Sequence, residues 1–297
     1  MTNADSSIAA RETEAAEKWD IEIKPNPSWF NIPFKEIWSY RDLLRMFVRR
    51  DFVAVYKQTV LGPLWFVLQP VLTTVIFMFV FGRVAHIPTD GIPSALFYMA
   101  GLTLWTFFST CFTKGGATFT LNASLFGKVY FPRLISPLGT LLINLLNFGI
   151  QFGVFLVMLV WYVVMGKITL HFNAFTLMLP VILFLTGALG LGLGLIVSSL
   201  TTRFRDLIYV ATFAIQLLMY ASPVIYSLKF LKDGSFSKQV IVLNPVSYLL
   251  ESFRIGIFDV GMVNWGYFAY SSICSLAILF VGVIMFNKSE KTFMDVI

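Results

Sequence analysis

Charged residues are scarce in this chain of 297 residues. Asp, Glu, Lys and Arg make up 13% of it, whereas hydrophobic residues make up 57%. Six stretches contain none of these four residue types: 58–82, 91–113, 134–166, 168–202, 207–228 and 260–287. Each is long enough for the roughly 20 apolar residues that cross a ~30 Å hydrocarbon layer as a helix. A soluble domain would keep one charged face on its helices. The pattern predicts an all-α, polytopic membrane protein with six transmembrane helices.

Residues suited to metal or disulfide chemistry are equally few. The two cysteines, Cys111 and Cys274, both lie within predicted spans, so no disulfide framework is indicated. His86 and His171 are isolated, with no second ligand at metal-binding spacing. No Ser–His–acid set follows from spacing either. We therefore predict no catalytic residues, no metal site and no cofactor bound by this chain.

The sequence also lacks a nucleotide-binding loop. The nearest approach ends at Gly127-Lys128, but Asn122 stands where the first glycine belongs and Val129 where Ser or Thr belongs. The cores of the spans carry no acid of the kind that proton- or sodium-driven carriers usually place there. Energy for any pumping must therefore come from outside this chain.

The distribution of Lys and Arg predicts the orientation in the membrane. With six spans, the two termini share one side with loops 114–133 and 203–206, and this side holds 16 of the 22 Lys and Arg residues. Cytoplasmic segments carry such an excess, so both termini are expected in the cytoplasm. This bias and attraction to anionic membrane lipids account for the net charge of +6. Nucleic acid is not an expected partner.

Four segments are expected. Residues 1–33 form a polar cytoplasmic tail, residues 58–287 the membrane domain, and residues 288–297 a second cytoplasmic tail. Residues 34–57 combine helical apolar spacing with arginines, which predicts an amphipathic helix in the membrane interface; a soluble docking helix is the alternative. Ser39 and Asp42 resemble a capping box and predict a new helix start there.

Two loops carry candidate functional residues. Loop 114–133 contains a short helix-like segment that we expect to expose Phe126, Tyr130 and Phe131 beside Lys128 and Arg133. Such anchors suit either a coupling contact with a partner or attachment to the membrane surface.

The predicted outer segment 229–259 includes the apolar run 239–250, which is too short to cross the bilayer and predicts a re-entrant segment. Asn244-Pro245 would interrupt its helix. Glu251 and Arg254 are spaced to pair.

Polar residues and glycines also occur inside the spans. Gln69, Asn144, Asn147, Gln151 and Gln216 either line a polar translocation path or form hydrogen bonds between helices. Gly187, Gly190, Gly192 and Gly194 are expected to permit close helix packing, rather than to form a dinucleotide turn, because no strand precedes them.

Several motifs together resemble a known family. RDLL at 41–44, RRD at 49–51, YKQTVLGPLW at 56–65 and QP at 69–70 form the first group. FPR at 131–133, NP at 244–245 and LLESFR at 249–254 add to it. From about residue 35 onward, the chain resembles the ABC-2 type permeases that export polysaccharides, namely those for O-antigen, capsule and teichoic acid.

The resemblance implies a transmembrane subunit that pairs with a second copy of itself and with two copies of a separate ATPase. That ATPase would use the ATP and Mg²⁺, and loop 114–133 would be the coupling element. The implied cargo is lipid-linked polysaccharide, O-antigen first, exported across the bacterial inner membrane. Two alternatives stay open: a membrane-embedded transferase acting on lipid-linked sugars, and an ABC-2 exporter of a drug or lipid. The transferase would need a group such as His86, Asp90, Glu251 or Asp259 on the outer side.

Overall fold

The computed structural model describes residues 34–57, 62–126, 129, 131–232 and 234–293. The predicted tail 1–33 lies outside these residues, whereas residues Pro33–Ile297 form one compact unit. All regular elements in the described part are helical, which confirms the all-α prediction. They are α2 (Phe34–Ser39), α3 (Arg41–Lys57), η1 (Gly62–Leu64), α4 (Trp65–Phe77), η2 (Met78–Val84), α5 (Ser94–Gly116), α6 (Thr118–Phe126), α7 (Ile135–Val164), α8 (Ala174–Leu177), α9 (Leu179–Thr201), α10 (Leu207–Tyr220), η3 (Leu228–Phe230), α11 (Phe236–Leu243), α12 (Pro245–Phe258) and α13 (Trp265–Phe293).

Five helices in the described part are long and apolar enough to cross a membrane: Trp65–Val84, Ser94–Gly116, Ile135–Val164, Leu179–Thr201 and Trp265–Ser289. The bent pair α11–α12 would make six if it counted as one span. The predicted fifth span, 207–228, is wrong in extent. Helix α10 has only 14 residues, about 21 Å at 1.5 Å per residue. It ends at Tyr220, and Pro223, which has no N–H, cannot continue the hydrogen-bond ladder.

Other boundaries also differ from the sequence prediction. Residues 168–178 do not join the fourth span, because Asn173 caps the separate helix α8 with its side chain. Helix α13 continues to Phe293, so part of the expected tail 288–297 is helical. The predicted new helix start near Ser39 is confirmed, since α2 ends at Ser39 and α3 begins at Arg41.

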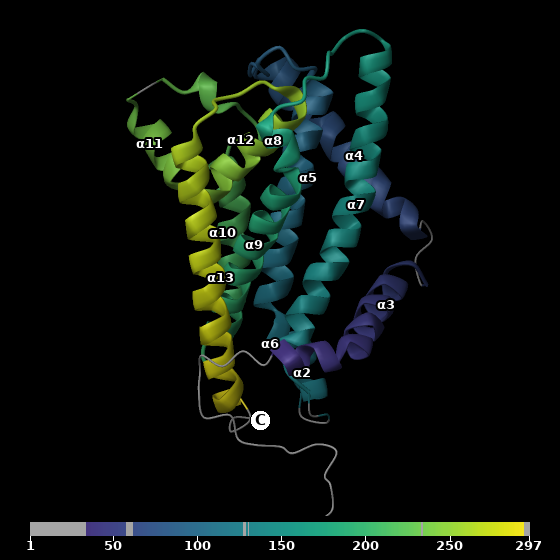
Figure 1. The fold of residues 1–297 in the computed structure, drawn as a ribbon, viewed down its shortest axis with the longest axis vertical. Helices are drawn as coiled ribbons and strands as arrows, with labels where there is room; N and C mark the ends of the chain where they lie inside the picture. The colour runs from purple at the N-terminus through teal and green to yellow at the C-terminus, as the bar shows by residue number, and fades with distance from the viewer. Residues whose placement is uncertain (1–33, 58–61, 127–128, 130, 233, 294–297) are drawn as a thin grey trace, which may run out of the picture. The chain divides into compact units, whose positions relative to one another are not determined.

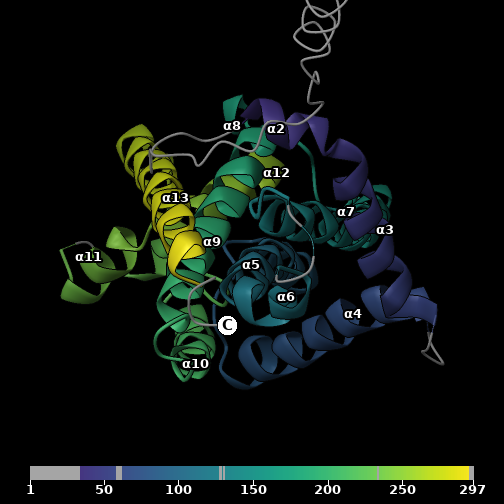
Figure 2. The same ribbon diagram turned by 90° about the horizontal axis from the view of Figure 1, so that it is seen from below.

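Helix α5 is the central helix of this unit. Seen from below, it is surrounded by α4, α6, α7, α9 and α10, while α3 runs along the outer side of α7 (Figure 2). Helices α2, α3 and α6 and the end of α13 lie at one end of the bundle, and α8, α11 and α12 lie at the other (Figure 1). The segments that lie together at each end of the bundle are those that the charge distribution assigns to the same side of the membrane.

The glycines of α9 do permit close packing, as the sequence predicts. A Cβ on Gly190 would lie 2.7 Å from the carbonyl oxygen of Phe108 in α5, and one on Gly194 would lie 2.7 Å from that of Phe112. On the other side of α9, a Cβ on Gly192 would lie 2.6 Å from the Cα of Leu279 in α13. Side chains at these positions would force the backbones apart. The three-helix core α5–α9–α13 therefore depends on small residues, as membrane helix interfaces commonly do.

Candidate functional site

An open groove of about 430 Å³ lies between α5 and α10. Its α5 wall consists of Trp105, Ser109 and Thr113, one on each of three successive turns. Its α10 wall includes Thr212, Gln216 and Tyr220 at the same spacing, together with the apolar residues Phe213, Ile215, Leu217 and Met219. Residues four apart lie on one face of a helix, so each wall is a continuous stripe. Gly116 at the end of α5 faces Ile208 at the start of α10, so the two helices run in opposite directions. Consequently Trp105 and Tyr220 lie toward the same end of the groove, whereas a third aromatic residue, Phe213, follows Thr212 nearer the other end.

Hydroxyl groups give this groove hydrogen-bonding capacity. The hydroxyls of Ser109, Thr113 and Thr212 donate to the carbonyl oxygens of Thr106, Ser109 and Ile208 on their own helices, at 3.2, 2.8 and 2.7 Å. This leaves their oxygen lone pairs available as acceptors. Gln216 is exposed and supplies amide donors as well as an acceptor. The groove therefore offers polar contacts along its length and aromatic surface at Trp105, Phe213 and Tyr220.

The structure does not join the five predicted path residues into one pathway. Only Gln216 lines the groove between α5 and α10, while Gln69 is exposed on α4. Asn144 is buried and its Oδ1 accepts from Lys114 Nζ at 3.2 Å, so it links α7 to α5. Asn147 and Gln151 also lie on α7 and are half-buried. For Asn144, the alternative of a hydrogen bond between helices is the one observed.

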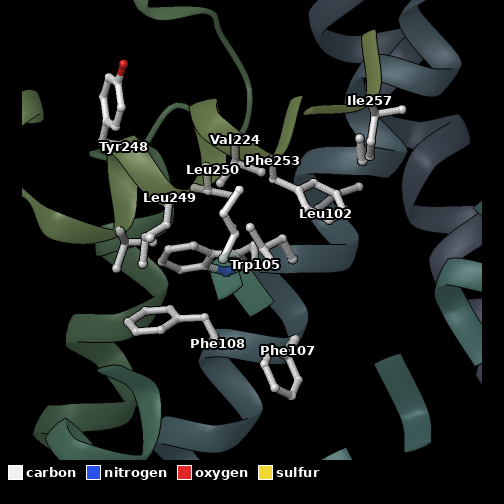
Figure 3. Packing of buried hydrophobic residues seen from close by; sticks show 14 of the residues in the cluster. Leu102, Trp105, Phe107, Phe108, Val224, Tyr248, Leu249, Leu250, Phe253 and Ile257 are labelled. Carbon is white, nitrogen blue, oxygen red and sulfur yellow. The ribbon is translucent and has the colours of Figure 1, made fainter. Parts of the chain in front are cut away.

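The groove adjoins the most deeply packed part of the molecule. Trp105 packs against Phe108, with 5.3 Å between their ring centroids. In Figure 3, both rings lie in one cluster with Leu249 and Leu250 of α12. Every residue of α12 from Val246 to Phe258 is buried. Trp105 of the groove thus lies beside buried side chains of α12.

The outer segment 229–259 folds as two helices that meet at a sharp bend. Helices α11 and α12 are bent by 86° at Asn244, where the sequence predicts an interruption. The Asn244 side chain accepts from the N–H of Val246 at 3.2 Å and caps α12, while Pro245 occupies its first turn. Asn244 Nδ2 also donates to Ser222 Oγ at 3.0 Å. The bend is therefore attached to the chain that follows α10. Its re-entrant position in a membrane stays a prediction.

Arg254 makes the second attachment of α12 to this chain. Its side chain is buried, and Nη1 donates to the carbonyl oxygens of Pro223 at 2.5 Å and Tyr226 at 3.3 Å. Nη2 donates to the carbonyl oxygen of Val224 at 2.6 Å. These carbonyls lie beyond the end of α10, where the regular hydrogen bonds of the helix stop, and the guanidinium donates hydrogen bonds to them instead.

Helix α5 completes the enclosure of this guanidinium. The Arg254 Cζ lies 3.8 Å from the centre of the Phe97 ring, in cation–π contact. One turn later, a Cβ on Gly101 would lie 2.5 Å from Arg254 Nη2. Only glycine leaves room for the guanidinium at this position, so α5, α12 and the turn after α10 meet at one charged group.

Glu251 and Arg254 do not form the direct ion pair for which they are spaced, although their charges attract each other. Among the described residues, ion pairs within 4 Å occur at Asp42–Arg45 and Arg50–Asp51, not here. Glu251 is buried, and its Oε1 accepts from the backbone N–H of Met262 at 3.2 Å. Glu251 thus binds the loop before α13, whereas Arg254 binds the turn after α10. Both segments present backbone groups to α12 that have no partner in a helix.

The coupling loop also differs from expectation. Phe126 and Phe131 are buried rather than exposed, with ring centroids 5.7 Å apart, and Phe131 packs edge-on against Phe47 of α3 at 5.8 Å. Arg133 is also buried, with its guanidinium 5.5 Å from the Phe126 ring centre. Lys128 and Tyr130 lie outside the described residues. The aromatic side chains fold inward because α3 and α6 supply an apolar surface for them. The exposed apolar groups here are Leu121 (71%) and Val129 (53%).

Sequence reasoning missed most of the groove. Trp105, Ser109, Thr113, Thr212 and Tyr220 were not predicted as site residues, although the spacing of four between polar residues on both helices was a usable signal. The contact of Gly101 with Arg254 had no comparable signal. It joins residues 153 positions apart, and only the packing of α5 against α12 brings them together.

Comparisons with known proteins agree with this architecture. Residues 42–258 match the family model described as ABC-2 type transporter. The chain is 28% identical over 257 residues, 86% of its length and 95% of the relative's, to an O-antigen export system permease protein of Klebsiella pneumoniae. It is 31% identical over 222 residues, 74% of its length and 82% of the relative's, to a protein of the same name from Myxococcus xanthus. A polysialic acid transport protein of Escherichia coli is 23% identical over 78% of this chain and 87% of its own length.

A charge exchange tests the separate roles of Glu251 and Arg254. We expect E251R and R254E each to lower the free energy of unfolding by about 3–5 kcal/mol, because each leaves buried backbone partners unsatisfied. The double variant E251R/R254E should not recover stability, since neither new side chain matches the backbone groups that it meets. Thermal unfolding in detergent measures this effect. Recovery to wild-type stability in the double variant would show that the two charges do act as a pair.

Proposed function

Because the chain belongs to the ABC-2 transporter family, we propose that it is the membrane-spanning permease subunit of an ATP-driven exporter of lipid-linked polysaccharide. The observation that carries this proposal is the groove between α5 and α10, which combines hydroxyl, amide and aromatic groups within apolar helices. Sugars are recognised by such combinations of hydrogen-bonding groups and ring surfaces. O-antigen is the favoured cargo because two relatives from different bacteria bear that name. Capsule and teichoic-acid polymers are close variants.

A second copy of the chain is proposed to cover the groove. Helices α4 and α10 lie on the same side of α5 (Figure 2), and both are largely exposed. This surface carries Gln69 and Gln216, and polar side chains inside spans usually face other helices or a polar cavity rather than lipid. Two copies facing each other would turn two open grooves into one enclosed path.

The energy source is proposed to be a separate ATPase, present in two copies, that uses ATP and Mg²⁺. The family implies such a partner. The α6–α7 segment lies at the end of the bundle that carries α2 and α3 (Figure 1). We assign the contact to its exposed apolar residues Leu121 and Val129, with Lys128 and Tyr130 as further candidates. Buried Phe126, Phe131 and Arg133 would instead hold this segment against α3 and α6.

The alternative of a transferase receives no support from two of its four candidate groups. Glu251 is buried and bound to the Met262 N–H. Asp259 accepts from Asn173 Nδ2 at 2.7 Å in the cap of α12, where its φ is +56°. Both carboxylates thus have structural roles. The relatives are named as permeases or transport proteins, in agreement with transport.

The proposed orientation places both termini, Lys128 and Arg205 in the cytoplasm, and Asp90, Lys167 and Lys232 outside. It is supported by the excess of Lys and Arg in the tails and in loops 114–133 and 203–206 of the sequence. Single cysteines at positions 205 and 167, in a chain lacking Cys111 and Cys274, would be treated with an impermeant thiol reagent in intact cells. Only position 167 should react. Reaction at position 205 would reverse the assignment.

The groove is tested by filling it. Q216W places a large ring among the groove side chains, and we expect surface polysaccharide to fall to a small fraction of wild type while the protein remains inserted. V210W is the matched control, because Val210 is exposed on the same helix but does not line the groove. Surface polysaccharide and membrane protein level are measured together. Equal export by Q216W and V210W would exclude the groove from the path.

The coupling contact is tested by separating exposed from buried residues. L121S/V129S should leave the permease as stable as wild type but reduce the amount of ATPase that co-purifies with it. F131A removes a buried ring instead, and should lower the free energy of unfolding by about 3–5 kcal/mol. Normal ATPase binding and export by a stable L121S/V129S variant would place the contact elsewhere.

A further inference from the structure

A second open groove lies between α3 and the first half of α7, and the function proposed above does not use it. Its volume is about 700 Å³, and it shares no lining residue with the groove between α5 and α10. The two helices approach closely at Gly139, where a Cβ would lie 3.5 Å from the Phe47 Cβ. The groove opens within the next turns of α7.

The α3 side of this groove combines arginines with apolar residues, whereas the α7 side is apolar throughout. The apolar residues on the first side are Trp38 of α2 and Leu44, Val48 and Phe52 of α3. Arg41, Arg45 and Arg49 recur every four residues on α3 and therefore lie along one face. Leu142, Leu145 and Leu146 form the facing wall on α7, and all three are exposed. No Asp or Glu lines the groove in the described residues. Asp42, which accepts from Arg45 Nη1 at 3.1 Å, lies outside the lining.

We propose that this groove is a binding site for an anionic phospholipid of the membrane. The phosphate group contacts the three arginines of α3, and the parts of the acyl chains nearest the headgroup contact the three leucines of α7. Guanidinium groups bind phosphate oxygens in paired hydrogen bonds, and the aliphatic stems of arginine cover apolar chains. Helix α7 is a candidate span, so a lipid in the adjacent leaflet has its chains beside α7 and its headgroup at the level of α3.

Charge and position favour this occupant over others. Arg45 already pairs with Asp42, but a neutral or zwitterionic lipid would leave the net positive charge of Arg41 and Arg49 without compensation in the groove. The lipid-linked cargo is the other phosphate-bearing candidate, but its sugar chain belongs to a groove that shares no residue with this one. The bound lipid fills the space between α3 and α7 and thereby holds the amphipathic helix in position. This inference requires only that the chain lies in a membrane and does not depend on the cargo.

The test uses purified, delipidated full-length protein in detergent. Cardiolipin, phosphatidylglycerol and phosphatidylcholine of matched acyl chains are titrated, and thermal stability and native mass spectrometry report binding. We expect the two anionic lipids to raise the unfolding temperature in a saturable manner and phosphatidylcholine to have little effect, because a ligand that binds only the folded state stabilises it.

Two variants and one matched control locate the site. R41Q/R45Q/R49Q should weaken the apparent affinity for cardiolipin by about tenfold or more. K57Q/R203Q/R205Q removes the same charge elsewhere on the basic segments and should bind as wild type does. L142W/L146W fills the apolar wall, keeps every arginine and should also lose saturable binding.

Three results would overturn the proposal. Equal losses in the two triple variants would indicate general attraction between charges. Wild-type affinity in L142W/L146W would exclude the groove. Displacement of cardiolipin by a polyprenyl-diphosphate-linked glycan at lower concentration would assign the groove to the cargo.

Discussion

The buried guanidinium of Arg254 joins α5, α12 and the turn after α10, which are far apart in the sequence. It donates to three carbonyls in the turn after α10, lies against the Phe97 ring, and occupies the space that Gly101 leaves free on α5. Leaving a buried charge without its hydrogen-bond partners is strongly destabilising, so each of these partners has a restricted position. This constraint places α12 at the end of the bundle, where Leu249 and Leu250 lie beside Trp105 of the groove.

Two regions of the molecule are therefore held together by different kinds of contact. The core α5–α9–α13 relies on glycines that allow backbones to approach, and the region around α12 relies on polar groups bound to backbone segments. By contrast, α4 and α10 have few buried residues. The tightly packed part provides one wall of the groove, and the loosely packed part provides the other. A transport path needs a loosely packed wall, because this wall must adjust to different parts of the cargo while the tightly packed core keeps its arrangement.

At the end of the bundle that carries α2, α3 and α6, aromatic residues that the sequence predicts to be exposed are buried in the structure. Phe126 and Phe131 resemble anchors for a partner when read alone, because they lie beside basic residues in a loop. In the structure they pack against each other, and Phe131 also packs against Phe47 of α3. The amphipathic helix thus uses part of its apolar face for the loop and part for α7. The remaining arginine stripe faces the groove beside α7.

The sequence by itself determined the helical class, five of the six predicted spans, the break at Asn244 and the packing role of the α9 glycines. These features depend on local composition and spacing, since the bilayer requires long uncharged helices and Pro245 follows a capping Asn. Only the tertiary structure decided that Glu251 and Arg254 bind different backbone segments, that α10 ends at Tyr220, and that Ser109 and Thr212 line the same groove. Each of these depends on which distant segment presents an unpaired group or a free surface, and spacing along the chain does not contain that information.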